Sequence, residues 1–125
     1  RGQYIGTEPY NKWTKPSCVL IGEDNYSDAC GFPYVYKTLG IGKLIGAPVP
    51  GTMTAVWWEN QIDPSIVFGI PQVGALGVKE GRYLENMQIE PDILVYNDPA
   101  SVLRGEDRQL EAAVKEMLKT IDSNK

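Results

Sequence analysis

Apolar residues in the first half of the chain form short runs that end at glycines. Residues 17–21 consist of a serine and four apolar residues, and Gly22 follows them. Such a short apolar run predicts a strand buried on both faces. Residues 27–39 carry apolar side chains at helical spacing and stop before Gly40, so a helix is predicted there, and residues 41–46 predict a second strand. The order strand, helix, strand predicts a parallel pair of strands that the helix bridges.

Two details of the predicted helix depend on its apolar positions and its proline. Phe32, Tyr36 and Leu39 recur at i, i+4 and i+7, with Val35 adjacent, which is the spacing of a helix. Pro33 is expected near the first turns of the helix, where the missing N–H of a proline costs least.

The second half of the chain predicts further strands joined by turns. The expected strands are residues 52–59, 66–68, 73–78 and, as a short strand or extended segment, 93–96. Pro71 is expected in a turn between the second and third of these strands, and residues 79–82 form a predicted hairpin turn. Residues 1–16 show no period and are expected to form an irregular lead-in.

Residues 107–121 differ from the rest because they contain neither glycine nor proline and follow a helical period. Their apolar side chains at i, i+4, i+8 and i+11 form one stripe, made of Leu110, Val114, Leu118 and Ile121. We expect this C-terminal helix to close the domain and to pack through that stripe. Glu111 and Lys115 are spaced for an ion pair along the helix.

The length and charge of the chain limit the classes of function. A chain of 125 residues has room for one domain at most, so residues 1–125 are expected to form a single domain. A net charge of −4 disfavours binding to the phosphates of nucleic acids. There is no run of 18 apolar residues to predict a membrane span, and the first residues lack a signal-peptide pattern. A periplasmic or exported location and a cytoplasmic one both stay open.

Histidine is absent from the sequence. A Ser-His-Asp or Cys-His site made by this chain alone is therefore excluded. Cys18 and Cys30 supply too few soft ligands for a zinc site, and no metal or other cofactor is implied. Because the two cysteines fall on different predicted elements, we expect two free, buried thiols, and a disulfide between them is left open.

The polar turn after the first predicted strand is the first candidate for chemistry. Ser27 and Asp28 open the predicted helix, where a hydroxyl lies at the positive end of the helix dipole beside unpaired backbone N–H groups. Such N–H groups can stabilise an oxyanion, so this geometry suits a nucleophilic serine. The alternative is that Ser27 is simply an N-cap, which is the commoner role of a serine before a helix.

A second candidate is a segment with three carboxylates in eight residues, Glu85, Glu90 and Asp92. Its composition alone is typical of a solvated loop. Glu90 precedes Pro91 and is therefore expected to be extended.

These segments belong to a longer series of short motifs in a fixed order. The series comprises Cys18-Val-Leu-Ile-Gly-Glu23, Ser27-Asp28, Phe32-Pro33-Tyr34, Leu39-Gly40-Ile-Gly42, Leu44-Ile-Gly46, Leu84-Glu85-Asn86, Ile89-Glu90-Pro91-Asp92-Ile93 and a final segment from Asp98 to Val114. In order and spacing it resembles the tail-specific (C-terminal-processing) serine peptidases, and the tricorn protease branch in particular. The resemblance covers the C-terminal half of the family's catalytic domain.

The resemblance implies a fold and a set of site residues. The fold would be α/β, a crotonase-like or Clp-protease-like spiral of short strands and helices, here incomplete as a C-terminal catalytic subdomain and closed by the C-terminal helix. Ser27 corresponds to the nucleophile of the family, and the backbone N–H of Asp28 to part of its oxyanion hole. Glu85 corresponds to the glutamate that orients a histidine base.

The sequence departs from the family at the base. The lysine that serves the bacterial and plastid branch would fall near Thr52, and no lysine is near it. The histidine and second serine of the tricorn branch lie upstream of anything present here. Two explanations follow: the chain is part of a longer peptidase with its histidine on another segment, or it is a degenerate relative without activity.

The function that the resemblance implies is a serine-type peptidase, in which peptide bonds are cleaved by acyl transfer to Ser27 and then to water. Its partners would be a peptide or protein substrate and the upstream half of the catalytic domain, with a homo-oligomer left open. This chain alone is expected to be inactive. The alternatives are a peptide-binding or assembly domain that keeps the fold, and a crotonase-like acyl-CoA enzyme, which the lack of a basic groove for the CoA phosphates disfavours.

Overall fold

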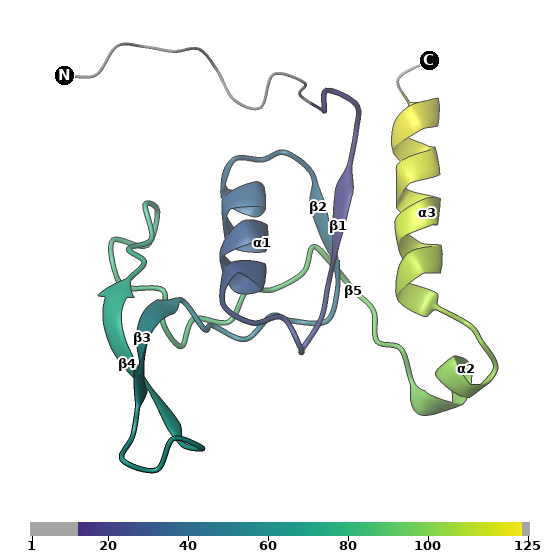
Figure 1. The fold of residues 1–125 in the computed structure, drawn as a ribbon. Helices are drawn as coiled ribbons and strands as arrows, with labels where there is room; N and C mark the ends of the chain where they lie inside the picture. The colour runs from purple at the N-terminus through teal and green to yellow at the C-terminus, as the bar shows by residue number, and fades with distance from the viewer. Residues whose placement is uncertain (1–12, 124–125) are drawn as a thin grey trace.

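The computed structural model describes residues 13–123 and has a mixed α/β architecture (Figure 1). In chain order the elements are β1 (Cys18–Ile21), α1 (Asp28–Thr38), β2 (Lys43–Gly46), β3 (Thr54–Asn60), β4 (Val67–Gly74), β5 (Ile93–Leu94), α2 (Pro99–Leu103) and α3 (Arg108–Asp122). Of the expected irregular lead-in, residues 1–12 lie outside the described part, and residues 13–16 contain no helix or strand. Each helix in the described part is too short or too polar to span a lipid bilayer.

A three-stranded parallel sheet forms the centre of the structure, in the order β1-β2-β5. β1 pairs with β2 from Cys18 opposite Lys43 to Ile21 opposite Gly46, which confirms the predicted strand–helix–strand unit. In Figure 1 the sheet lies between α1 and α3. The central strand β2 is covered on both faces, because its consecutive residues Leu44 and Ile45 are both fully buried.

The core lies on the α1 side of β2 and draws on distant parts of the chain. Its buried members are Ile21, Cys30, Tyr36, Leu44, Val49, Met53, Leu84 and Ile89. Burial of β1 on both faces was predicted and is wrong, because β1 is an edge strand and Leu20 is 43% exposed. Both thiols are free, as expected: Cys30 is fully buried, whereas Cys18 is only partly buried.

Helix α1 forms where the sequence predicted a helix, and Gly40 follows it with a φ of 65°. Of the three apolar residues at helical spacing, Tyr36 alone is buried. Phe32 and Leu39 are 60% and 68% exposed, and the residues that α1 buries are Cys30, Pro33 and Tyr36. The helix is apolar on more than one face, so its periodicity could not determine which face meets the sheet.

Pro33 lies in the interior of α1 and not in its first turns, which corrects the second prediction for this helix. An interior proline removes the N–H that would bond to the carbonyl four residues earlier, here that of Ala29. The Ala29 carbonyl accepts a hydrogen bond from the Asn25 side-chain Nδ2 at 2.7 Å instead. The turn before the helix thus satisfies the acceptor that Pro33 leaves open.

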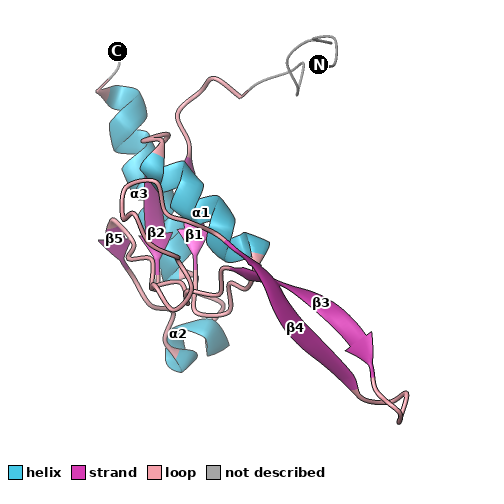
Figure 2. Ribbon diagram, turned by 90° about the vertical axis from the view of Figure 1, so that its left-hand side faces the viewer, coloured by secondary structure: helices cyan, strands magenta, loops and turns pink. Residues whose placement is uncertain are grey.

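Strands β3 and β4 form an antiparallel hairpin that extends away from the rest of the molecule (Figure 2). The prediction of two strands around a turn at Pro71 is wrong, since β4 is one continuous strand that contains Pro71. Pro71 lies opposite Val56, where the register shifts at a β-bulge. A proline is tolerated there because a two-stranded ribbon has open edges and a bulge already interrupts the ladder. Trp57 and Trp58 are each 62% exposed on this hairpin.

The segment between the hairpin and α3 partly follows the predictions. Residues 78–80 form the expected turn, closed by hydrogen bonds between Gly77 and Arg82 and between Gly81 and Gly77. β5 is the predicted short strand, limited to Ile93–Leu94. Helix α2 was not predicted, although Asp98-Pro99 carries its start signal: the Asp98 side chain accepts from Ser101 N–H and Pro99 is the first helical residue.

Helix α3 packs against β1 and β2, as expected of a closing helix, but through a different face. The predicted stripe of Leu110, Val114, Leu118 and Ile121 is about half exposed, and the buried residue of α3 is Ala113. The partly buried residues on the same face of α3 as Ala113 are Gln109, Ala112, Glu116, Met117 and Thr120. The expected ion pair of Glu111 with Lys115 does not form; Glu116 pairs with Lys43 of β2.

Asp92 anchors the short β5 segment to β2. Its Oδ2 accepts from Leu44 N–H at 2.8 Å, its own N–H donates to the Leu44 carbonyl at 2.8 Å, and its Oδ1 lies 3.1 Å from Lys37 Nζ. Burial by itself would raise the pKa of Asp92, but the Leu44 N–H and the Lys37 ammonium outweigh it and hold the pKa below its usual value.

Asp92→Ala is expected to lower the free energy of unfolding by about 1–3 kcal/mol near neutral pH, because the buried Leu44 N–H loses its acceptor. A carboxylate whose pKa is lower in the folded state stabilises above its unfolded pKa of about 3.9, and this contribution is lost as the pH falls through the folded pKa. Urea unfolding at neutral and at acid pH measures the difference between variant and wild type, which should shrink on acidification. The exposed Asp24→Asn serves as control, and an equal difference at both pH values contradicts the assignment.

Candidate active site

Ser27 lies at the point where the chain turns from β1 into α1. It has a φ of 54° and a ψ of −117°, in a region of backbone conformation that residues other than glycine rarely adopt. Such conformations cost about 1–3 kcal/mol and persist only where the surroundings enforce them. Ser27 is exposed, so the turn presents its side chain at the surface.

The hydroxyl of Ser27 does not cap the helix. Although Ser27 occupies the N-cap position of α1, its side chain makes no capping hydrogen bond. Its backbone carbonyl accepts from Cys30 N–H at 2.7 Å and from Gly31 N–H at 3.1 Å. The N-cap explanation therefore does not account for a serine here.

Asp28 follows Ser27 as the first residue of α1. Its backbone N–H makes no hydrogen bond to the described residues, whereas the next N–H, of Ala29, donates to the Tyr26 carbonyl at 3.0 Å. The Asp28 N–H is thus an open donor at the positive end of the α1 dipole, one residue from the Ser27 hydroxyl.

Ser27 and Asp28 open into a cavity of about 230 Å³, which we call the Ser27 cavity. Its walls come from the start of α1 and from both strands at the base of the hairpin; they are Ser27, Asp28, Gly31, Thr52, Met53, Thr54, Ala55, Val73, Gly74 and Ala75. These described lining residues include no amine and no imidazole. Thr52, where the family lysine would fall, is among them.

Glu85 is bonded to the wall of the Ser27 cavity, although it is not itself a lining residue. Its Oε2 accepts from the Thr54 hydroxyl at 2.7 Å and from Met53 N–H at 2.8 Å. These two hydrogen bonds lower the pKa of Glu85 below its usual value, and the bond from Thr54 has the larger effect. The carboxylate is therefore ionised at neutral pH and held by the segment that faces Ser27.

The sequence did not indicate Met53 or Thr54 as partners of Glu85. They precede it by 32 and 31 positions, and only the folding of the hairpin base against residues 84–86 brings them together. A threonine at the start of a strand carries no signal of its own, because β-branched residues are common in strands for packing alone.

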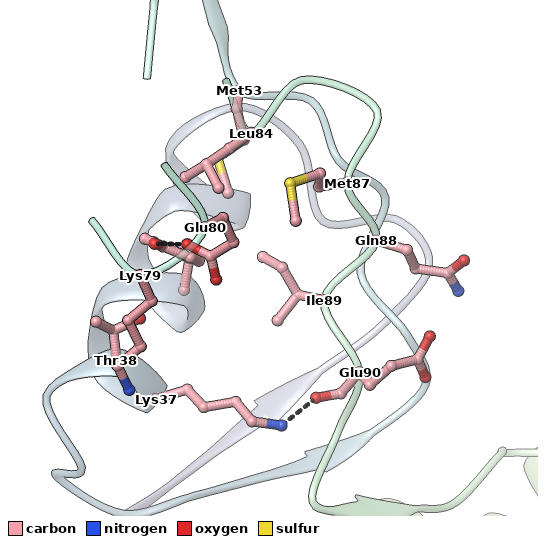
Figure 3. A pocket seen from close by; sticks show the side chains of 11 residues that line it. Lys37, Thr38, Met53, Lys79, Glu80, Leu84, Met87, Gln88, Ile89 and Glu90 are labelled. Carbon is pink, nitrogen blue, oxygen red and sulfur yellow. Dashed lines mark hydrogen bonds between the residues drawn. The ribbon is translucent and has the colours of Figure 1, made fainter. Parts of the chain in front are cut away.

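A second cavity of about 270 Å³ lies beside the C-terminal half of α1 (Figure 3). Met53, which also lines the Ser27 cavity, forms part of its wall, and Figure 3 shows Met87 and Ile89 pointing into it while Gln88 points away. Lys37 at its rim donates to the Glu90 carbonyl at 2.7 Å and pairs with Asp92. Lysines of this region therefore line the second cavity and not the Ser27 cavity.

Known proteins share both the sequence pattern and the fold. The profile of peptidase family S41 matches residues 2–95, which is more than half of the chain. The chain belongs to peptidase family S41.

Individual relatives agree with this assignment. A Chlamydia pneumoniae protein is 34% identical over 90 residues, which cover 71% of this chain and 14% of that protein. The tricorn protease of Thermoplasma volcanium is 27% identical over 120 residues, covering 94% of this chain and 12% of the protease. A crystal structure of the tricorn protease superposes with a TM-score of 0.75 at 25% identity, over 84% of this chain and 10% of that chain.

These matches confirm the resemblance to the tricorn branch that the motifs indicated. This S41 chain spans 12–14% of the length of the two relatives described. Within it, the structure brings Ser27 and Asp28 to one cavity and ties Glu85 to the opposite wall through Met53 and Thr54.

Replacing Ser27 in this S41 chain tests the strain at the turn. Ser27→Gly should unfold at higher urea than Ser27→Ala, with a free energy of unfolding about 1 kcal/mol greater, because glycine adopts a positive φ without cost. The same pair of substitutions at the exposed, mid-helical Lys115 should give the opposite sign, since glycine costs about 1 kcal/mol relative to alanine in a helix interior. A Gly variant at position 27 no more stable than the Ala variant would refute the strain.

Proposed function

We propose that this chain is the C-terminal part of the catalytic domain of an S41 serine peptidase. Ser27 is the nucleophile, the Asp28 N–H donates to the oxyanion, and Glu85 orients a histidine base that this chain does not supply. The observation that carries the proposal is the turn at Ser27: a strained, exposed serine whose hydroxyl caps nothing, next to an open N–H in the same cavity. Membership of a peptidase family supports the reaction class.

The proposed reaction is hydrolysis of a peptide bond in two acyl transfers. The Ser27 Oγ attacks the scissile carbonyl carbon, its proton passes to the histidine, and the negative oxygen that forms accepts from the Asp28 N–H. The histidine then gives the proton to the leaving amine, and water repeats the sequence to release the acyl group from Ser27. An ionised Glu85 stabilises the positive charge that the histidine carries between these steps.

The cleft for the substrate would lie at the base of the hairpin. Both β3 and β4 contribute walls to the Ser27 cavity, and a two-stranded ribbon keeps an open edge on each side. An extended peptide or protein segment would bind there by adding a strand, with its scissile bond at Ser27.

We also propose that residues 1–125 form one domain of the crotonase-like or Clp-protease-like spiral, completed by an upstream half. Exposed apolar side chains on the hairpin and on α3, among them Trp57, Trp58 and Leu118, support a covering partner or a homo-oligomer. A peptide-binding or assembly domain without activity is the outcome if the tests below fail. The acyl-CoA alternative is set aside, because the chain belongs to a peptidase family.

The isolated chain of 125 residues is expected not to hydrolyse peptides. It contains no histidine, and loss of the base in a serine protease costs on the order of 10⁶-fold in rate. Incubation with a mixture of unstructured peptides, followed by mass spectrometry, checks this. Robust turnover that Ser27→Ala abolishes would mean that the base has been misassigned.

In the full-length protein, Ser27→Ala should abolish hydrolysis and Glu85→Gln should lower kcat by roughly 10²–10⁴-fold. The glutamine still accepts from Thr54 and Met53 through its side-chain oxygen, so the fold is retained while the charge opposite the histidine is lost. Steady-state kinetics with a peptide substrate give kcat and KM, and the exposed Glu111→Gln on α3 is the matched control. An unchanged kcat in Glu85→Gln would show that Glu85 does not orient the base.

A further inference from the structure

The amide side chain of Asn25 joins the two ends of the turn that carries Ser27. Its Oδ1 accepts from Gly22 N–H at 3.0 Å, directly after β1, and its Nδ2 donates to the Ala29 carbonyl at 2.7 Å, within the first turn of α1. Ser27 lies inside the loop that these two hydrogen bonds close. One side chain thereby fixes the end of the strand relative to the start of the helix.

The backbone of Asn25 holds the same turn from a second direction. Its N–H donates to the Gly22 carbonyl at 3.2 Å, and its carbonyl accepts from the buried thiol of Cys30 at 3.3 Å. Asn25 is therefore attached to the strand end, to the helix and to the core, and its position is set by all three.

The hydrogen bond to Ala29 is available because of Pro33. In an uninterrupted helix the Ala29 carbonyl would accept from the N–H of residue 33, which proline lacks. The Asn25 amide takes that place, so the proline inside α1 and the asparagine before it act as a pair. This pairing separates Asn25 from an ordinary polar turn residue, which would bond only to its neighbours in the turn.

Ser27 needs such external support. Its φ of 54° is unfavourable for serine, and its own side chain makes no capping bond that would keep it there. We propose that Asn25 is the positioning residue that holds Ser27 in this conformation and so aims its hydroxyl beside the Asp28 N–H. The catalytic meaning of this inference rests on the proposed function, whereas the structural coupling does not.

The coupling between Asn25 and the backbone conformation of Ser27 can be measured on the 125-residue chain by its stability alone, with no assay of peptide hydrolysis. Urea midpoints are determined for wild type, Ser27→Gly, Asn25→Ala and the double variant. If Asn25 enforces the strained conformation, Ser27→Gly raises the midpoint in the wild-type background, and this rise is lost in Asn25→Ala, where the turn can relax.

Asn97→Ala is the matched control, because the Asn97 amide also makes two hydrogen bonds, to Asp107 and to the Gln109 N–H, away from Ser27. The rise from Ser27→Gly should persist in that background. If Asn25→Ala does not fold, Asn25→Asp replaces it, since it keeps the acceptor for Gly22 and loses the donor to Ala29. A rise of equal size in both backgrounds, or no rise in either, overturns the inference.

Kinetics of the full-length protein test the consequence. Asn25→Ala should lower kcat by about 10- to 100-fold with little change in KM, because a displaced nucleophile slows chemistry more than binding. An unchanged kcat overturns the positioning role. If Ser27→Ala itself leaves hydrolysis intact, the proposed function fails, and the urea cycle still decides whether Asn25 holds Ser27.

Discussion

The parallel pairing of β1 with β2 constrains everything around Ser27. Parallel neighbours cannot be joined by a tight turn, so the chain must leave the end of β1 and return along a helix that covers the sheet. The helix of that crossover begins seven residues after β1 ends. The strained backbone of Ser27, the open Asp28 N–H and the Asn25 amide all lie in this one connection between strand and helix.

The same parallel pairing explains why the candidate site is built from two parts of the fold, the start of α1 and the base of the hairpin. The crossover brings the start of α1 against the base of the β3–β4 hairpin, and the loop that follows the hairpin returns to hold that base through Glu85. Met53 is central here, since it belongs to the core, lines both cavities and donates its N–H to Glu85. Packing of the core and geometry of the site are therefore set by the same segment.

The sequence predicted the order of the elements better than the faces through which they pack. Runs bounded by glycine located β1, α1 and β2, because backbone preferences act locally. The sequence did not show which faces of α1 and α3 are buried. Helix α1 carries apolar side chains on more than one face, and the single apolar stripe of α3 is about half exposed while Ala113 is buried. The turn predicted at Pro71 was wrong for a related reason. Whether a proline ends a strand depends on its pairing, and the register shift beside Pro71 already interrupts the ladder there. The roles of Ser27 and Glu85 came from resemblance to a family. Met53 and Thr54 bond to Glu85 across more than 30 positions of the chain, which no local pattern shows, and the bonds of Asn25 depend on the conformation of the turn.

The hairpin separates its base, which forms part of the Ser27 cavity, from a tip that projects away from the fold (Figure 2). Residues beyond the bulge at Ala55 and Val56 do not line the cavity from the β3 side. Matched pairs of residues inserted there would lengthen the ribbon without moving Ser27. An insertion of a single residue into one strand would instead shift the register and exchange the two faces of the ribbon from that point outward. Changes in the length of this hairpin are thus tolerated in steps of paired residues, so the hairpin can gain new surface without a change in the turn that carries Ser27.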